Sequence, residues 1–276
     1  MAGQRSEYDV VHEFIERLAG EVLHPKQIDS LAHAVIGAVH AEVASIHAIA
    51  RAAARERNVS EKHSIKQVDR LLANSKVDAV EVMQHVAPIL LAEHAQIAVA
   101  VEWIEFASEG HSTIAASMMR KDGSAIPLFW MTMGGKKLEK RRAQYEARIR
   151  GLLRLAVSEH VEVTVLGERA LGSQKRARFG LPLRDTTLST PGRRDRMLLI
   201  LVFARIFVAV GASGNGRELD GLLRAGAETR RRTRSLFRRG REYLASVACA
   251  ATRDVERTCL ALWSEHDATD RIDVVL

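Results

Sequence analysis

Hydrophobic and polar positions along the chain change their spacing twice, from a helical period to an alternating one and back. Over residues 27–57, apolar side chains recur every three or four positions, which predicts one long amphipathic helix. A second helix is expected over residues 62–74, and a third from an N-cap at Ser75 to about Pro88. The first part of the chain is therefore expected to be helical.

From residue 97 the apolar period becomes two, which is typical of strands. We expect strands over residues 97–106, 111–120 and 125–133, with a hairpin turn at 121–124. A basic helix with Leu155 on its inward face is expected over 136–156, and a buried strand over 161–166 whose residues Val161, Val163 and Val165 share one face. Three strands, a helix and a strand, in this order, match the front half of a ribonuclease-H-like fold.

The remaining third of the chain returns to a helical pattern. Pro191 is expected to open a helix that runs towards a loop at Gly211, followed by a short helix, an arginine-rich helix from Glu228 and a last helix to about Trp263. The most apolar run, residues 197–212, carries Arg205 and is shorter than the roughly 20 residues of a membrane span. We therefore interpret it as a core helix, and we expect no membrane partner.

Positive charge is concentrated in two places. Lysine and arginine number 41 against 34 acids, a net charge of +7, and residues 224–241 hold eight arginines and one acid. Such clustering favours a polyanion partner, above all nucleic acid, although a solvated helix face is the alternative. Lys62, Lys66 and Arg70 lie four residues apart and form a basic stripe, which suits either a DNA-docking helix pair or an ordinary helical hairpin.

Histidines and cysteines give no metal motif. His33, His40 and His47 are spaced by seven residues, which places them two helical turns, about 10 Å, apart, too far to share one ion. We interpret them as boundary residues of an amphipathic helix. The two cysteines make no disulfide framework and the N-terminus is polar, so a cytoplasmic protein is expected.

Six segments within residues 25–263 carry a resemblance to one known family. They are KHSIKQVDRLLAN at 62–74, VEWIEF at 101–106, PLFWMT at 127–132, VTVLGERALGSQK at 163–175, STPGRRDRMLLI at 189–200 and RRRTRSLFRRG at 230–240. In sequence and order they are similar to the DDE-type transposases of the "IS four" insertion-sequence family. The resemblance implies a core that holds Mg²⁺ or Mn²⁺ and acts on double-stranded DNA at transposon ends.

The acids of that core are altered in this chain. The family's first two metal-binding aspartates correspond to Glu102, before Trp103, and Glu168, before Arg169, and the resemblance implies that both are catalytic and metal-binding positions. Each glutamate reaches about 1.5 Å further than an aspartate. The family's third acid precedes a stretch similar to RFGLPL at 178–183, but here Lys175 leads almost directly into that stretch. We therefore expect impaired catalysis.

Other acids are not expected to replace the missing one. Asp185, Glu228 and Asp195 are the nearest in sequence, and Asp195 is interpreted as a helix-start charge paired with neighbouring arginines.

Three hypotheses for function stay open: a metal-dependent DNA transposase, a DNA-binding remnant that forms a homodimer or inhibits an intact copy in mixed multimers, and a relic without a role. In the first two, phosphate contacts are expected from three basic segments. The expected DNA-binding residues are Lys62, Lys66, Arg70, Lys136, Lys137, Arg141, Arg230, Arg231, Arg232, Arg234 and Arg238.

Together these patterns predict a mixed α/β (α+β) chain in three parts. Residues 1–94 are expected to form a helical, DNA-binding N-terminal domain, and residues 95–180 a partial ribonuclease-H-like sheet with a truncated catalytic core. Residues 181–276 are expected to form a helical, arginine-rich C-terminal region.

Overall fold

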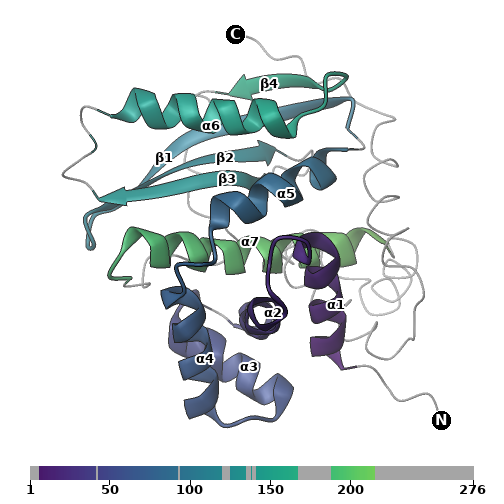
Figure 1. The fold of residues 1–276 in the computed structure, drawn as a ribbon, viewed down its shortest axis with the longest axis vertical. Helices are drawn as coiled ribbons and strands as arrows, with labels where there is room; N and C mark the ends of the chain where they lie inside the picture. Colours follow the sequence, from purple (N-terminus) through teal and green to yellow (C-terminus); the bar gives the residue numbers. More distant parts are fainter. Residues whose placement is uncertain are drawn as a thin grey trace, which may run out of the picture.

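The structure, a computed structural model of the 276-residue chain, describes residues 6–41, 43–92, 94–119, 125–134, 138, 141–166 and 188–214. In these ranges the chain forms seven helices and one four-stranded sheet (Figure 1), so the predicted mixed α/β class is confirmed. Helices α5 and α6 lie against the sheet, and α7 runs between the sheet and the helices α1–α4. The buried apolar side chains of all these elements join in one hydrophobic core.

The N-terminal part contains five helices. The helical period predicted a helical region correctly, but it did not predict the number and bounds of the helices. They are α1 (Glu7–Ala19), α2 (Pro25–His40), α3 (Ile46–Arg57), α4 (Glu61–Ala73) and α5 (Ala79–Leu91). The expected single helix over 27–57 is wrong, because the chain turns extended at Ala41 and restarts where the Ser45 side chain accepts a hydrogen bond from the Ala48 N–H. The expected N-cap at Ser75 is also wrong, since Asp78 caps α5.

Helix α1 was not expected, yet it has clear local causes. The Ser6 side chain accepts from the Asp9 N–H while the Asp9 carboxylate accepts from Ser6, a capping box that starts the helix. Val11, Phe14 and Ile15 recur at helical spacing and are at most 2% exposed.

The sheet agrees with the alternating pattern to within one residue at most strand ends. Its strands are β1 (Gln96–Phe106), β2 (His111–Met119), β3 (Ala125–Gly134) and β4 (Glu162–Leu166), in the order β3-β2-β1-β4. Strands β1, β2 and β3 are antiparallel neighbours, whereas β4 pairs with β1 in parallel. The connection between β3 and β4 contains α6 (Arg142–Ala156), the crossover helix that a parallel pair requires.

Two positions of this region are more exposed than expected. Leu155, assigned to the inner face of its helix, is 79% exposed, because α6 turns Ile149, Leu152 and Leu153 inward instead. Val165, expected in a buried strand, is 53% exposed, because β4 is the edge strand of the described sheet.

Helix α7 (Pro191–Gly214) carries the most apolar part of the chain into the centre of the fold. Residues 197–204 are at most 1% exposed, which confirms the expected core helix. The expected loop from Gly211 is wrong as far as Gly214, because the helix continues to that residue. None of the helices in the described ranges has the length and apolar character that a membrane span requires. The helices expected beyond residue 214 lie outside the described residues.

Candidate functional site

Glu102 is a buried acid in an interior strand of the sheet. It lies in the middle of β1, opposite Ala115 of β2, and only 1% of its surface is exposed. Both carboxylate oxygens are excluded from solvent. Because burying a carboxylate is unfavourable unless a cation or hydrogen-bond donors offset the lost hydration, such a position marks either a ligand site or an internal polar contact.

The face of the sheet that carries Glu102 is covered by the beginning of α7. Glu102, Ala115 and Trp130 are paired across β1, β2 and β3, so their side chains share this face. The Trp130 indole N–H donates to the Asp195 carbonyl of α7 at 3.2 Å. The next residue of β1, Trp103, points to the other face and donates to Glu146 of α6 at 3.0 Å. Helices α6 and α7 therefore cover opposite faces of the sheet.

Asp195 lies on the Glu102 side of the sheet and is held by β3. It is hydrogen-bonded to the backbone and side chain of Thr132, and its Oδ1 is excluded from solvent. Burial raises the pKa of this carboxyl from 3.8 to about 7, while the Thr132 hydrogen bonds and Arg196 oppose the rise. Asp195 does interact with the neighbouring Arg196, as the sequence interpretation expected, but burial against the sheet has the larger effect on its pKa.

Glu168, the other expected metal-binding position, lies outside the described residues, two positions after the end of β4. Within the described ranges, no group of three potential ligands gathers around Glu102. Within this part of the chain, Glu102 has the right donor type for the expected Mg²⁺ or Mn²⁺ site, but three ligands do not come together there to hold an ion.

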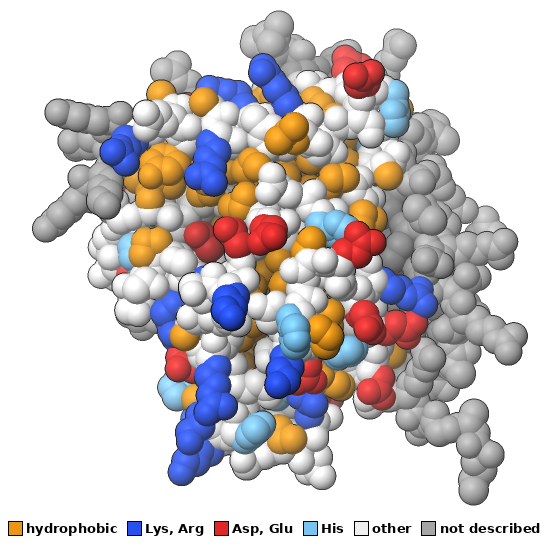
Figure 2. Space-filling view, in the orientation of Figure 1, with side chains coloured by type: hydrophobic (Ala, Val, Ile, Leu, Met, Phe, Trp, Pro, Cys, Tyr) orange, Lys and Arg blue, Asp and Glu red, His pale blue; other side chains and the backbone are white. Residues whose placement is uncertain are grey.

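The expected basic stripe is on the surface. Lys62, Lys66 and Arg70, here called the α4 stripe, are all exposed on α4, while Ser64, Val68, Leu71 and Leu72 on the opposite side are buried. Figure 2 shows lysine and arginine side chains gathered over the end of the molecule where α4 lies. Among the described residues, no salt bridge engages the three cations of the stripe.

The acids of α4 are paired with other elements. Glu61 lies 3.4 Å from Arg51 of α3, and Asp69 lies 2.5 Å from Arg193 of α7. Arg196 of α7 donates to the Leu72 carbonyl at 2.7 Å, close to the C-terminus of α4. These contacts anchor α4 and neutralise its carboxylates, which leaves the α4 stripe as the dominant charge on its outer face.

Helix α4 follows α3 after a three-residue turn. Asn58 adopts the left-handed conformation with φ 50°, and the Ser60 side chain caps α4 by accepting from the His63 N–H. Two helices joined by a turn of this length form either an ordinary helical hairpin or a helix-turn-helix. The helix pair considered in the sequence analysis was α4 with the helix after it, α5, from which residues 74–78 separate it.

Of the other expected DNA contacts, Arg141 is exposed immediately before α6. The remaining ones lie outside the described residues: Lys136, Lys137, Arg230, Arg231, Arg232, Arg234 and Arg238.

A buried serine–histidine pair joins α2, α3 and α4, but it is arranged for structure rather than catalysis. His33 is fully buried, and its Nε2 lies 2.7 Å from the Ser64 hydroxyl, which itself donates to the Ala50 carbonyl at 2.6 Å. Nε2 must therefore carry the proton, and Nδ1 accepts from Arg57 at 3.2 Å. Burial lowers the pKa of His33 from 6.5 to about 4. The imidazole is neutral and fully bonded, so it cannot take a proton from Ser64.

This burial also corrects the sequence interpretation of the three histidines. His33 is a core residue, and His40 ends α2 between two glutamates. His47 is exposed on a different helix. The seven-residue spacing did not reveal these three environments, because the chain breaks between α2 and α3.

Comparison with protein-family models, with curated proteins and with solved structures finds no match to this chain.

Proposed function

We propose that this chain is a DNA-binding protein of the DDE insertion-sequence transposase type with an impaired catalytic centre. The observation that carries the proposal is the sheet: three antiparallel strands and a crossover helix precede a strand that is parallel to the first, and a buried acid lies in the middle of β1. This order suits a partial ribonuclease-H-like core, in which the first metal-binding acid belongs to the first strand. The proposal therefore unites the strand order with the motif resemblance.

The register of the parallel pair supports the same proposal. Gln96 pairs with Glu162 and Ala100 with Leu166, a constant separation of 66 residues, since 162 − 96 and 166 − 100 are both 66. Glu102 and Glu168 are separated by the same 66 positions. We propose that these two glutamates occupy the ancestral ligand positions of the site. Glutamate reaches about 1.5 Å beyond aspartate, whereas Mg²⁺ holds its ligands at about 2.0–2.1 Å, so metal binding at these positions is expected to be weak.

DNA binding is proposed for the helix-turn-helix formed by α3 and α4. The α4 stripe presents three cations from one exposed helix face, and the buried Val68 and Leu72 fix the rotation of the helix on the core. Cations at this spacing contact phosphates and release counterions on binding, so affinity should fall steeply with salt. The proposal concerns phosphate contacts, which give affinity without sequence specificity.

The catalytic and binding hypotheses are separated by one pair of assays on the full chain. Binding to double-stranded DNA is measured by fluorescence anisotropy over a salt series, and nicking of supercoiled DNA carrying element ends is followed with Mg²⁺ or Mn²⁺. We expect salt-dependent binding without a nicked product. A nicked product that disappears in Glu102→Ala would show that the centre is active and that impairment is wrong. If the slope of log binding constant against log salt concentration is near zero, the DNA-binding hypothesis is refuted, and the proposed function with it.

A further inference from the structure

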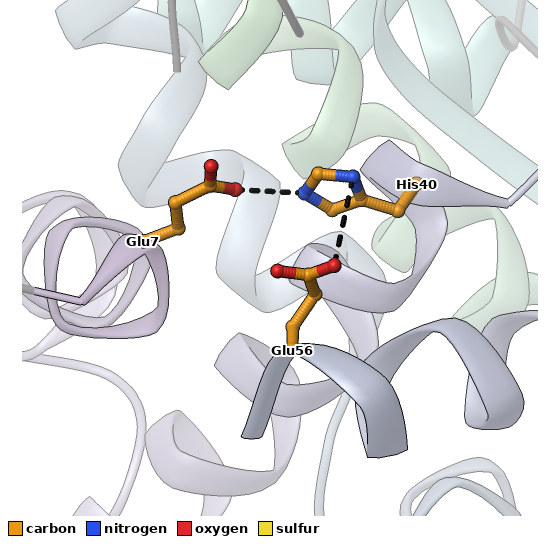
Figure 3. A group of neighbouring side chains, drawn as sticks. All are labelled: Glu7, His40 and Glu56. Atoms are coloured by element: carbon orange, nitrogen blue, oxygen red, sulfur yellow. Dashed lines mark hydrogen bonds and ion pairs between the residues drawn. The ribbon is translucent and has the colours of Figure 1, made fainter. Parts of the chain in front are cut away.

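Three side chains from three helices converge on one histidine at the surface of the N-terminal helices (Figure 3). His40, in the last turn of α2, has Nε2 at 2.8 Å from the Glu7 carboxylate of α1 and Nδ1 at 4.0 Å from the Glu56 carboxylate of α3. One potential ligand atom from each residue lies within 4.8 Å of the others. The side chains of His40, Glu7 and Glu56 are 23%, 18% and 33% exposed, so the cluster is half-buried and can be reached from solvent.

Two carboxylates in this cluster share one histidine. Within the described part of the chain, no lysine or arginine forms a salt bridge with Glu7 or Glu56. A neutral imidazole has one N–H and can donate to only one of the two carboxylates. The second carboxylate would then face an acceptor nitrogen, an arrangement that either a proton on the imidazole or a bound metal ion would stabilise.

The donor set selects the kind of metal. One imidazole nitrogen and two carboxylate oxygens suit a divalent first-row transition ion such as Zn²⁺, with water completing the coordination, whereas Mg²⁺ and Ca²⁺ prefer oxygen ligands alone. Ligands held about 2.0–2.1 Å from Zn²⁺ in a tetrahedral site lie roughly 3.4 Å from one another. In the structure the two carboxylates face different ring nitrogens, Glu7 facing Nε2 and Glu56 facing Nδ1. An ion binds only one of these nitrogens, so the glutamate on the other side must rotate toward it. One ligand atom of each residue already lies within 4.8 Å of the others, so rotation of a partly exposed glutamate side chain can close the site.

We propose that Glu7, His40 and Glu56 bind one divalent transition-metal ion, which clamps α1, α2 and α3 together. This site is distinct from the acidic position on β1 and does not depend on the proposed function. It belongs to the helices that precede α4, so an ion there would stiffen the support of the helix-turn-helix.

Zinc uptake by the full chain tests the proposal through a difference between variants. The chain contains 11 histidines, so the total amount of Zn²⁺ bound does not identify this site. Isothermal titration calorimetry therefore compares the Zn²⁺ affinity of the parent with the affinities of Glu56→Gln and His40→Asn. Glu56→Gln keeps the Glu7–His40 hydrogen bond and is expected to fold as the parent does, which circular dichroism checks. The matched control is His85→Asn, which removes a histidine that lies 3.9 Å from a single glutamate, Glu21.

We expect the parent and His85→Asn to bind one Zn²⁺ with equal affinity. Glu56→Gln should bind this ion at least about 10-fold more weakly, and His40→Asn should not bind it. Zinc should also raise the melting temperature of the parent by about 5 °C more than that of Glu56→Gln. Equal zinc titrations and equal melting shifts in all four proteins would overturn the proposal and leave an ion-pair cluster alone. Loss of the same ion in His85→Asn would overturn it as well.

Discussion

The buried carboxyl of Asp195 should make the stability of the fold depend on pH in a direction opposite to that of most acids. Its pKa is raised from 3.8 to about 7, chiefly by burial of the side chain between α7 and β3. A carboxyl whose pKa rises on folding holds a proton in the folded state that the unfolded state has already released. The free energy of unfolding should therefore fall as the pH rises from about 4 to about 7, and stay low above that window.

The magnitude follows from the size of the pKa difference. About three pH units, at about 1.4 kcal/mol each, give an upper limit of about 4 kcal/mol, which relaxation and water entry reduce. Asp195→Asn resembles the protonated carboxyl and cannot ionise. We expect the variant to exceed the parent in free energy of unfolding by about 2–4 kcal/mol at about pH 8, and to match it within about 1 kcal/mol at about pH 4.

Urea denaturation followed by circular dichroism, at several pH values between these limits, measures both free energies. The difference between variant and parent is the informative quantity, because His33 titrates in an overlapping window with the opposite sign. A difference that is the same at both ends of the pH range would refute the reasoning, since it would show that the carboxyl ionises in the folded state as readily as in the unfolded state.

Three further predictions concern the packing of the helices. His33 should add about 3 kcal/mol to the stability between about pH 4 and 6.5, because a histidine whose pKa falls on folding destabilises the fold only where the unfolded chain binds the proton. The difference between the parent and His33→Gln in pH-dependent urea denaturation should therefore rise by this amount across the window, whereas the opposing contribution of Asp195 is common to both proteins and cancels. Ser64→Ala should destabilise the chain by about 1–3 kcal/mol in the same assay, because the buried imidazole N–H loses its acceptor. Gly37→Ala should lower the melting temperature sharply, with overpacking of about 1–3 kcal/mol or more, since an added Cβ would lie 2.2 Å from the Ile49 carbonyl oxygen. The control Gly151→Ala, on an open helix face, should be neutral or stabilising by up to about 1 kcal/mol, and a Gly37→Ala protein as stable as this control would contradict the close contact of α2 and α3.

The sequence predicted the sheet well because each strand signal is local. Alternation at residues 97–106 and 125–133, with a turn between the second and third strands, located β1 and β3 to within one residue at each end. The α7 core helix could also be predicted, from a long apolar run interrupted only by Arg205. In each case the pattern and the burial have the same cause, namely contact with one continuous core.

The helical part was less readable because its breaks have weak local signals. No glycine or proline follows directly after the end of α2. The only local signal of the break is Ser45, a residue type that favours the N-cap position and caps α3. The Glu7, His40 and Glu56 cluster could not be predicted, because its members are separated by 33 and 16 residues and meet only through the packing of three helices. The burial of Asp195 was missed for the same reason, since β3 supplies the surface that desolvates it.

We propose that the exposed face of α4 binds the phosphates of duplex DNA. The most direct test compares the salt dependence of duplex binding in the parent, in a triple alanine variant of the α4 stripe, and in a control that loses the same charge from α6. The control replaces Arg148, Arg150 and Arg154, which are all exposed.

If the claim is correct, removal of the α4 stripe lowers the log–log salt slope by about 2–3, because each phosphate contact contributes about 0.9, while the α6 control changes it by less than about 1. Equal slopes in the two triple variants would mean that net charge alone attracts DNA, and would contradict the assignment of the interface to α4.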